Sequence, residues 1–357
     1  MTVNSKPPSA SSEPLESLTD FGALTSGYED MIGKLRIIDA GELAAYLKSR
    51  VIGQNTVIDS ICTRLHRRMA IDRAQTTKPI AVFCFAGAPG VGKSYLSKIL
   101  AEKLFGSGKH LHFFEMGQLR DAHAASTLFG QPPEYRGGRG ALSKALRDVP
   151  DSIILLDEFE KAHRDIHLRF LSAWNDGFIT DLHDGLKYST KDAIFVLTVN
   201  AGSRQIAEKA RDKSVSQDDL NKFARNALQD AQFAPEILSR IDDVFAFREL
   251  EGLDIARVVA LEIQKKAREY GLEIAGKGID PKILLGAIEE FTKNKPDGGV
   301  REIARHLEEK IADGLINAKS SGARKVLFEA DGADVVVHAA RDPAADMTID
   351  DGRPVTR

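Results

Sequence analysis

Apolar residues along the chain fall into two alternating kinds of pattern. Four short runs rich in aliphatic and aromatic residues predict strands, of which the first is expected to be buried: Ile80–Gly87, His110–Met116, Ser152–Asp157 and Ala193–Asn200. The segment Ser94–Phe105 has instead the spacing of an amphipathic helix. Strands that alternate with helices predict a parallel sheet with helices on both faces. The ligand of such a sheet is expected at the carboxyl ends of its strands.

After about Leu250 the pattern becomes mainly helical. The stretches Leu253–Leu272, Pro281–Asn294 and Val300–Lys319 predict helices, and Lys325–Ala340 predicts a strand, a turn and a second strand. We interpret this part as a smaller second domain.

These patterns divide the chain into four parts. Residues 1–35 are rich in Ser, Pro and Gly and cannot bury enough apolar surface to offset the entropy of ordering, so we predict a disordered arm. A large α/β domain is expected at 36–249, the smaller domain at 250–345, and a polar tail at 346–357.

The composition is that of an ordinary globular protein and argues against several functions. The net charge is −3 over 357 residues, so no overall positive field would attract nucleic acid or anionic lipid. Cys62 and Cys84 lie among apolar residues and are interpreted as buried thiols, and the nine histidines lack a metal-ligand spacing. No apolar run approaches the roughly 20 residues that cross a bilayer. We expect a cytoplasmic protein without a membrane or nucleic-acid partner.

The sequence GAPGVGKS matches the pattern GxxxxGK[ST] between a predicted strand and a predicted helix. Glycines let backbone N–H groups surround phosphates, and the helix N-terminus adds the positive end of a dipole. Lys93 is expected to reach the β- and γ-phosphates of ATP, and Ser94 to bind Mg²⁺. The alternative is a Gly-rich turn without a ligand. The predicted nucleotide-binding residues of this segment are Gly87, Ala88, Pro89, Gly90, Val91, Gly92, Lys93, Ser94 and Tyr95.

An acidic pair ends the apolar strand in IILLDE. Carboxylates at this position are costly to bury unless they face a ligand cavity. Asp157 is a candidate for the Mg²⁺ shell through water, and Glu158 is a candidate for the base that polarises the attacking water. The alternative is an acidic cap at the start of a helix.

Three further polar residues are candidates for the same chemistry. Asn200 ends the next apolar strand and either orients the water or forms a turn. Arg240 in PEILSRIDD and Arg301 in GGVREIARHL could stabilise charge that develops on the γ-phosphate. Spacing alone does not separate that role from a solvated or salt-bridged arginine.

Together these motifs resemble one AAA+ module of the Clp family, and in particular the second ATPase ring of ClpB-type disaggregases and unfoldases. The matching stretches run in the family's order from about residue 43 to 345 and include VIGQ, GAPGVGKS, DEFEKAH, LTVNAGS, SRID and GGVRE. A Walker pair alone would indicate only a P-loop ATPase, whereas this combination is far more specific. The resemblance implies a P-loop AAA+ fold, in which an α/β domain with a parallel sheet precedes a mainly helical domain with a short strand pair.

The resemblance also implies roles that spacing does not give. Val51 and Ile52 fall where the family packs adenine, and Asn200 falls at the sensor asparagine. Arg240 corresponds to the finger that reaches the nucleotide of the neighbouring subunit, and Arg301 to the second sensor. The active site would then be complete only in a homo-oligomeric ring, for which a hexamer is expected.

The Gly/Pro-rich stretch GQPPEYRGGRG by itself predicts only a surface connection. In the family this place holds the axial pore loop, which implies that Tyr135, Arg136 and Gly137 grip a threaded protein. A tyrosine offers a broad apolar face and a polar tip with few torsions to freeze.

The sequence therefore predicts an ATP- and Mg²⁺-dependent motor that remodels or unfolds a protein substrate or adaptor-bound client. No IGF- or IGL-type tripeptide follows Asn200–Ser203, so docking to a Clp peptidase is not expected. One alternative is a nucleic-acid-handling AAA+ ATPase such as a helicase loader or branch-migration motor, and another is an ATP-controlled assembly switch. The basic cluster that could serve nucleic acid consists of Arg64, Arg67, Arg68 and Arg73.

Overall fold

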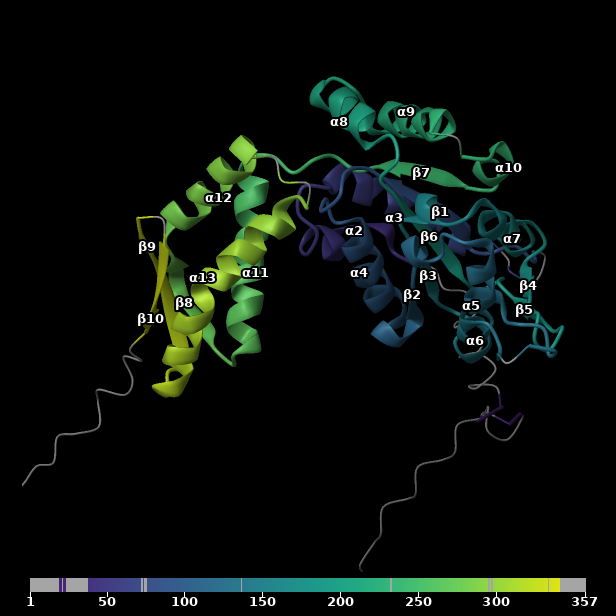
Figure 1. Ribbon diagram of the computed structural model, residues 1–357, viewed down its shortest axis with the longest axis horizontal. Helices are drawn as coiled ribbons and strands as arrows, with labels where there is room; N and C mark the ends of the chain where they lie inside the picture. The colour runs from purple at the N-terminus through teal and green to yellow at the C-terminus, as the bar shows by residue number, and fades with distance from the viewer. Residues whose placement is uncertain are drawn as a thin grey trace, which may run out of the picture.

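The computed structural model describes residues 19–20, 22–23, 38–71, 73, 76–135, 137–231, 233–294, 296, 298–332 and 334–340. Most of the predicted arm at 1–35, the whole tail at 346–357 and the pore-loop candidate Arg136 lie outside these residues. The described residues form two lobes, one built on a five-stranded sheet and the other on helices and a three-stranded sheet (Figure 1).

The sheet of the larger lobe is parallel throughout, which confirms the predicted fold class. Every residue of its two central strands β1 and β6 is buried, because helices cover both faces. A separate antiparallel hairpin is formed by β4 (Phe178–Thr180) and β5 (Lys187–Ser189). The order of the five strands is β2 (Leu111–Glu115), β3 (Ile153–Asp157), β6 (Ile194–Val199), β1 (Ala81–Ala86) and β7 (Asp243–Ala246).

Two hydrophobic clusters hold the helices against the two faces of this sheet. α2 begins after Asp39, whose carboxylate accepts two backbone N–H groups of the first turn, and these bonds lower the pKa of Asp39. One face carries α2 (Ala40–Lys48), α3 (Asn55–Met69) and α4 (Lys93–Phe105). The other carries α5 (Ala125–Phe129), α6 (Ala141–Asp148), α7 (Arg164–Asn175), α8 (Ser203–Arg211), α9 (Gln217–Asp230) and α10 (Pro235–Leu238).

The smaller lobe has its own hydrophobic cluster, built from residues between Leu250 and Phe328. It contains the predicted strand pair and a third strand, β8, that the sequence did not predict. β8 contains two glycines, and its pairing with β9 shifts register, so no clear alternation marks it. The elements are α11 (Leu253–Glu269), β8 (Glu273–Ile279), α12 (Pro281–Asn294), α13 (Val300–Ser320), β9 (Lys325–Asp331) and β10 (Asp334–Ala339).

No helix in the described part of the chain has the length and hydropathy of a membrane span. Cys62 and Cys84 are free and buried, as their apolar neighbours predict, and burial raises the pKa of each thiol to about 12.

Asp181 binds the loop Gly130–Gly140 at the place where the loop joins the larger lobe. Asp181 is fully buried, and its carboxylate accepts hydrogen bonds of 2.8 Å from the backbone N–H groups of Gly140 and His183. A Cβ atom on Gly140 would lie 2.0 Å from the carbonyl oxygen of Leu128, so only glycine fits there. The two ends of the loop are therefore fixed to each other and to the β4–β5 hairpin.

Replacing Asp181 by alanine is expected to lower the free energy of unfolding by about 3 kcal/mol, because two N–H groups lose their acceptor and each unsatisfied group costs about 1–3 kcal/mol. Trp174, the single tryptophan of the chain, lies in the same hydrophobic cluster and reports the urea transition by fluorescence. The matched control is Asp176→Ala, at an exposed position of the same region, with an expected change within about 0.5 kcal/mol. Equal transition midpoints for the two variants would contradict this role of Asp181.

Candidate functional site

The phosphate-binding motif forms the connection between β1 and α4. Gly90 and Gly92 have φ angles of 77° and 97°, in the left-handed region that favours glycine. A Cβ atom on Gly90 would lie 2.9 Å from the carbonyl oxygen of Gly298, in the smaller lobe. At the carboxyl edge of the sheet, the backbone of this loop therefore packs directly against the backbone of the smaller lobe, with no side chain between them.

Lys93 is buried at the start of α4, and its ammonium group donates three hydrogen bonds. The acceptors are the carbonyl oxygens of Gly87 and Ala88 and Oδ1 of Asn200, each 2.8 Å from Nζ. Burial lowers the pKa of Lys93 to about 8, and the nearby carboxylates of Glu160 and Asp157 act in the opposite direction. A phosphate at this place would supply the negative charge that favours the protonated form.

The hydroxyl of Ser94 lies beside the carboxylate of Asp157. Ser94 Oγ donates to Asp157 Oδ1 at 2.6 Å, and Thr198 Oγ1 donates to the same oxygen at 2.7 Å. Mg²⁺ prefers oxygen ligands and in nucleotide sites uses one or two carboxylates together with phosphate oxygens. The oxygen atoms of Ser94 and Asp157 therefore fit a Mg²⁺ ion bound with a nucleotide.

Glu158 adopts a backbone conformation that is rare for a residue with a side chain. Its φ and ψ angles are 55° and 48°, a left-handed conformation that costs about 1–2 kcal/mol for a non-glycine residue. Its Oε1 accepts a hydrogen bond from Nδ2 of Asn200 at 3.3 Å, and its Oε2 forms an ion pair with Nζ of Lys161 at 2.6 Å. Strained residues cluster at functional sites, and here the strain accompanies direct contact with Asn200.

The structure adds two residues to this network that sequence reasoning missed. Glu160 is largely buried, and its Oε1 accepts the backbone N–H of Asn200 at 2.8 Å, while burial raises its pKa. Thr198 accepts the N–H of Glu158 at 2.9 Å and binds Asp157, so it connects the two acidic residues. The signal for Thr198 was a single polar residue within an otherwise apolar strand.

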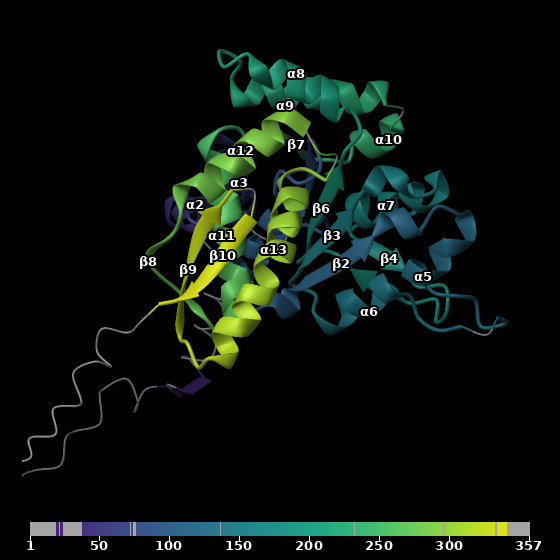
Figure 2. The same ribbon diagram turned by 60° about the vertical axis from the view of Figure 1, so that its left-hand side comes forward.

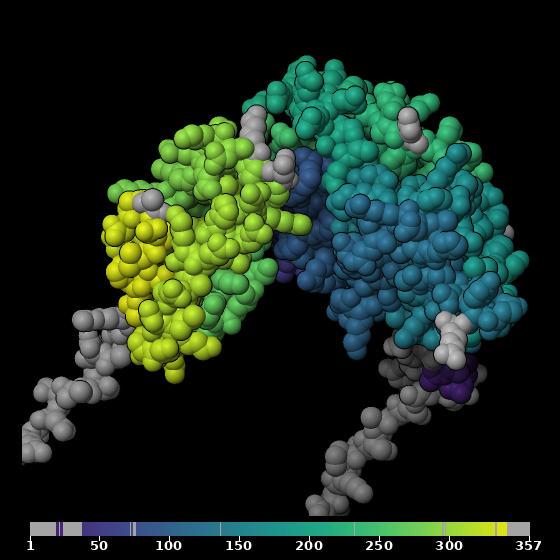
Figure 3. Space-filling view, viewed as in Figure 1, coloured from purple at the N-terminus to yellow at the C-terminus, as the bar shows by residue number. Residues whose placement is uncertain are grey.

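A cleft of about 970 Å³ separates the two lobes beside this network, and Figure 3 shows the hollow between them. Part of the cleft wall on the side of the smaller lobe is apolar and consists of Leu250, Val258 and Leu261. Arg301 enters from the first turn of α13. The predicted residues that line the cleft are Val51, Ile52, Gly90, Val91, Gly92, Tyr95 and Arg301.

The predicted arginine finger and the predicted pore loop do not line the cleft. Arg240 is exposed on the turn after α10, and its side chain has no hydrogen-bond or ion-pair partner among the described residues. Tyr135 is 68% exposed, and its loop projects from the side of the molecule opposite the three-stranded sheet (Figure 2). Gly137, in the same loop, is also exposed.

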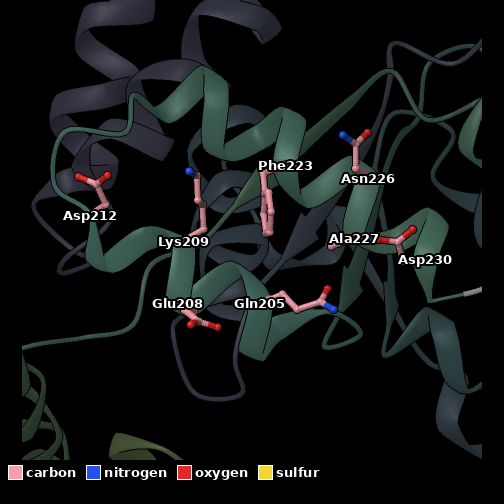
Figure 4. A pocket seen from close by; sticks show the side chains of 8 residues that line it. All are labelled: Gln205, Glu208, Lys209, Asp212, Phe223, Asn226, Ala227 and Asp230. Atoms are coloured by element: carbon pink, nitrogen blue, oxygen red, sulfur yellow. The ribbon is translucent and has the colours of Figure 1, made fainter.

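A second hollow of about 480 Å³ lies between α8 and α9 (Figure 4), and its lining contains none of the predicted site residues. Charged and amide side chains dominate it, and Phe223 is its single aromatic residue. The cleft between the lobes is therefore the cavity in which the predicted nucleotide site lies.

Most of the basic cluster before β1 is engaged within the chain. Arg68 forms ion pairs with Asp242 at 3.1 Å and Asp243 at 3.6 Å, and Arg64 lies 3.6 Å from Asp243. Arg73 donates hydrogen bonds to backbone carbonyl oxygens at the amino edge of the sheet. Three of the four arginines of this cluster therefore have a partner within the chain.

Comparison with known proteins gives matches over most of the chain. Residues 78–244 match the family described as AAA domain (Cdc48 subfamily), and residues 27–120 match the family Torsin. The chain is 32% identical over 299 residues to the chaperone protein ClpB of Clostridium tetani, an alignment that covers 82% of this chain and 34% of that protein. It is 34% identical over 279 residues to the ATP-dependent Clp protease ATP-binding subunit ClpE of Bacillus subtilis, covering 76% of this chain and 38% of that subunit.

The ClpB of Staphylococcus epidermidis is also similar, with 34% identity over 277 residues, 75% of this chain and 31% of that protein. This chain thus spans about a third of the length of the curated relatives it matches. The parallel sheet, the motif GAPGVGKS between β1 and α4 and the match to an AAA domain are those of an ATPase of the P-loop AAA+ class. With its matches to ClpB and ClpE, the chain belongs to the Clp family of AAA+ ATPases.

Proposed function

We propose that this chain hydrolyses ATP in the cleft between its lobes and uses the energy to remodel or unfold a protein as part of a ring. One observation carries the proposal. Side-chain hydrogen bonds join Lys93 to Asn200 and Asn200 to Glu158, while Asp157 is linked to the backbone of Glu158 through Thr198. These residues come from the start of a helix and the ends of two strands, next to the loop 90–92 that lines the cleft. The relatives named chaperone protein ClpB support the same function.

In this proposal the cleft holds ATP with its base against Val51 and Ile52. Lys93 exchanges its present carbonyl acceptors for phosphate oxygens, which keeps its ammonium group protonated. Ser94 and Asp157 hold Mg²⁺, which neutralises phosphate charge when bound. These residues bind and orient the nucleotide and leave the proton transfer to Glu158.

Glu158 acts as the general base. Its carboxylate takes a proton from the water that attacks the γ-phosphorus, and the amide of Asn200, 3.3 Å from Oε1, orients the same water. The ion pair with Lys161 holds the other oxygen, Oε2, and must adjust as the carboxylate turns toward the water. Arg301 reaches the nucleotide from the smaller lobe, so that hydrolysis changes the contact between the lobes.

The exposed position of Arg240 supports a role at a neighbouring nucleotide. Arg240 is exposed, does not line the cleft of its own chain and has no partner for its side chain among the described residues, so it is free to stabilise γ-phosphate charge at another chain's site. A closed ring supplies such a neighbour to every subunit. We therefore propose a ring, with six subunits as the expected number.

The Tyr135 loop is the proposed contact with the protein substrate. An exposed aromatic residue on a loop that Asp181 holds at Gly140 can grip a chain without bending the lobe beneath it. The engaged basic cluster favours a protein substrate over nucleic acid.

Replacing Tyr135 by alanine is expected to leave basal ATP hydrolysis within about twofold of wild type and to abolish substrate-stimulated hydrolysis and unfolding, because an exposed residue outside the cleft is removed. Unfolded casein is a suitable protein probe, and double-stranded DNA is tested beside it. The control Tyr135→Phe keeps the aromatic face and is expected to retain most activity. Unchanged unfolding by the alanine variant, or stimulation by DNA alone, would refute a threading function.

A further inference from the structure

β7 is an edge strand, and a polar face of α9 covers its open side. Its backbone pairs with β1 on one side only, so the other side needs different hydrogen-bond partners. α9 lies along that side (Figure 1) and presents Gln217, Asn221 and Arg225, which are spaced four residues apart and share one helix face. Asn221 Oδ1 accepts the N–H of Ala246 at 2.8 Å, and Gln217 Nε2 donates to the carbonyl oxygen of Ala246 at 2.9 Å.

Arg225 continues this face to the segment that carries Arg240. Its Nη1 donates to the carbonyl oxygen of Leu238 at 2.8 Å. Its Nη2 donates to the carbonyl oxygens of Ile241 at 2.8 Å and Asp242 at 3.3 Å. One planar guanidinium group therefore binds backbone on both sides of Arg240.

The same segment is fixed from the sheet side at Asp242. The N–H of Asp242 donates to the carbonyl oxygen of Val82 at 2.9 Å, and its Oδ2 accepts the N–H of Val82 at 2.8 Å. Arg68 adds an ion pair to Oδ1 of Asp242 at 3.1 Å. The contacts of Asp242 lie only on the C-terminal side of Arg240. Arg225 binds backbone on both sides of Arg240, so it fixes the conformation of the turn.

We propose that Arg225 is a positioning residue for Arg240, holding the turn after α10 so that Arg240 meets the nucleotide of a neighbouring subunit. The inference rests on the proposed ring function. The fixed fork of the guanidinium can serve several carbonyl groups at once, whereas a lysine ammonium binds as a compact point charge. A misplacement of about 1 Å at a catalytic group can cost about 100-fold in rate, so small movements of this turn matter.

The test compares Arg225→Met alone and in mixed rings. Alone, it is expected to lower kcat by about 10- to 100-fold, with the Kd of a fluorescent ATP analogue unchanged, because its own cleft is intact. It is then mixed with Glu158→Gln chains, which lack the base but keep Arg240 and Arg225. Sites that combine the cleft of an Arg225→Met chain with the arginine of a Glu158→Gln chain are complete, so the mixture is expected to hydrolyse ATP several times faster than the sum of the separate variants.

Arg73→Met is the matched control, since Arg73 also binds backbone carbonyls, but those of Lys78 and Lys191 instead of the residues around Arg240, and its kcat is expected to stay near wild type. If Arg225→Met does not fold, Arg225→Lys takes its place, with a smaller loss and the same rescue expected. The inference would be overturned if the folded Arg225 variant had a wild-type kcat. It would also be overturned if Glu158→Gln chains rescued Arg240→Ala but did not rescue the Arg225 variant. Failure to rescue Arg240→Ala itself would instead overturn the proposed ring.

Discussion

Glu158→Gln is expected to bind ATP and assemble normally but to hydrolyse ATP at least 100-fold more slowly than the wild-type chain. Glutamine has the shape of glutamate and can still accept the hydrogen bond from Asn200, but it cannot take a proton from water. A positioned general base contributes about 10²- to 10⁴-fold to a rate. Hydrolysis is measured as phosphate release, ATP binding as the Kd of a fluorescent ATP analogue, and assembly as the mass of the oligomer.

Glu160→Gln is the matched control for this experiment. The two glutamates are two positions apart, and both contact Asn200, but Glu160 binds its backbone N–H and is largely buried. The amide oxygen of glutamine can still accept the backbone N–H of Asn200, so a far smaller loss is expected. Normal turnover by Glu158→Gln, or an equal loss in both variants, would refute the assignment of the base. An ATP-loaded Glu158→Gln ring is also expected to retain its protein client.

Arg240→Ala is expected to reduce hydrolysis by about 1,000-fold or more in a ring made only of this variant. An arginine supplied to the γ-phosphate from a neighbour contributes about 10³- to 10⁵-fold to phosphoryl transfer. Because Arg240 is exposed and outside its own cleft, binding of ATP is expected to be unchanged. Mixing with Glu158→Gln chains is expected to restore activity, since each intact cleft can then face an intact arginine.

The control for Arg240 is Arg257→Ala, which removes an exposed arginine of α11 that forms an ion pair with Asp254 at 2.9 Å. Its activity is expected to remain within about twofold of wild type, as for most surface changes. If Arg240→Ala loses activity in strict proportion to the number of altered chains, with no recovery in mixtures, the arginine acts within its own subunit and the trans role is wrong.

Local pattern was sufficient to predict the main elements of this fold. The four apolar runs correspond to β1, β2, β3 and β6. β1, β3 and β6 are buried and therefore apolar on both faces, whereas β2 is an edge strand on which Phe113 is 53% exposed. The hairpin of β4 and β5 and the strand β8 were not predicted, because each is short or glycine-bearing and depends on contacts with other elements. Helices α8 and α9 have many polar residues, and only their packing on β7 and its neighbours distinguishes their faces.

The sequence by itself determined the phosphate-binding loop, the acidic pair and the order of strands and helices, because each depends on residues adjacent in the chain or on a regular spacing. Only the tertiary structure decided the contacts that join them. Lys93 meets Asn200 across 107 positions, and Ser94 meets Asp157 across 63. The hydrogen bonds of Arg225 on both sides of Arg240 also depend on the fold. A guanidinium group can bind many acceptors, and only the packing of α9 against the edge strand β7 brings it to the carbonyl groups of Leu238, Ile241 and Asp242.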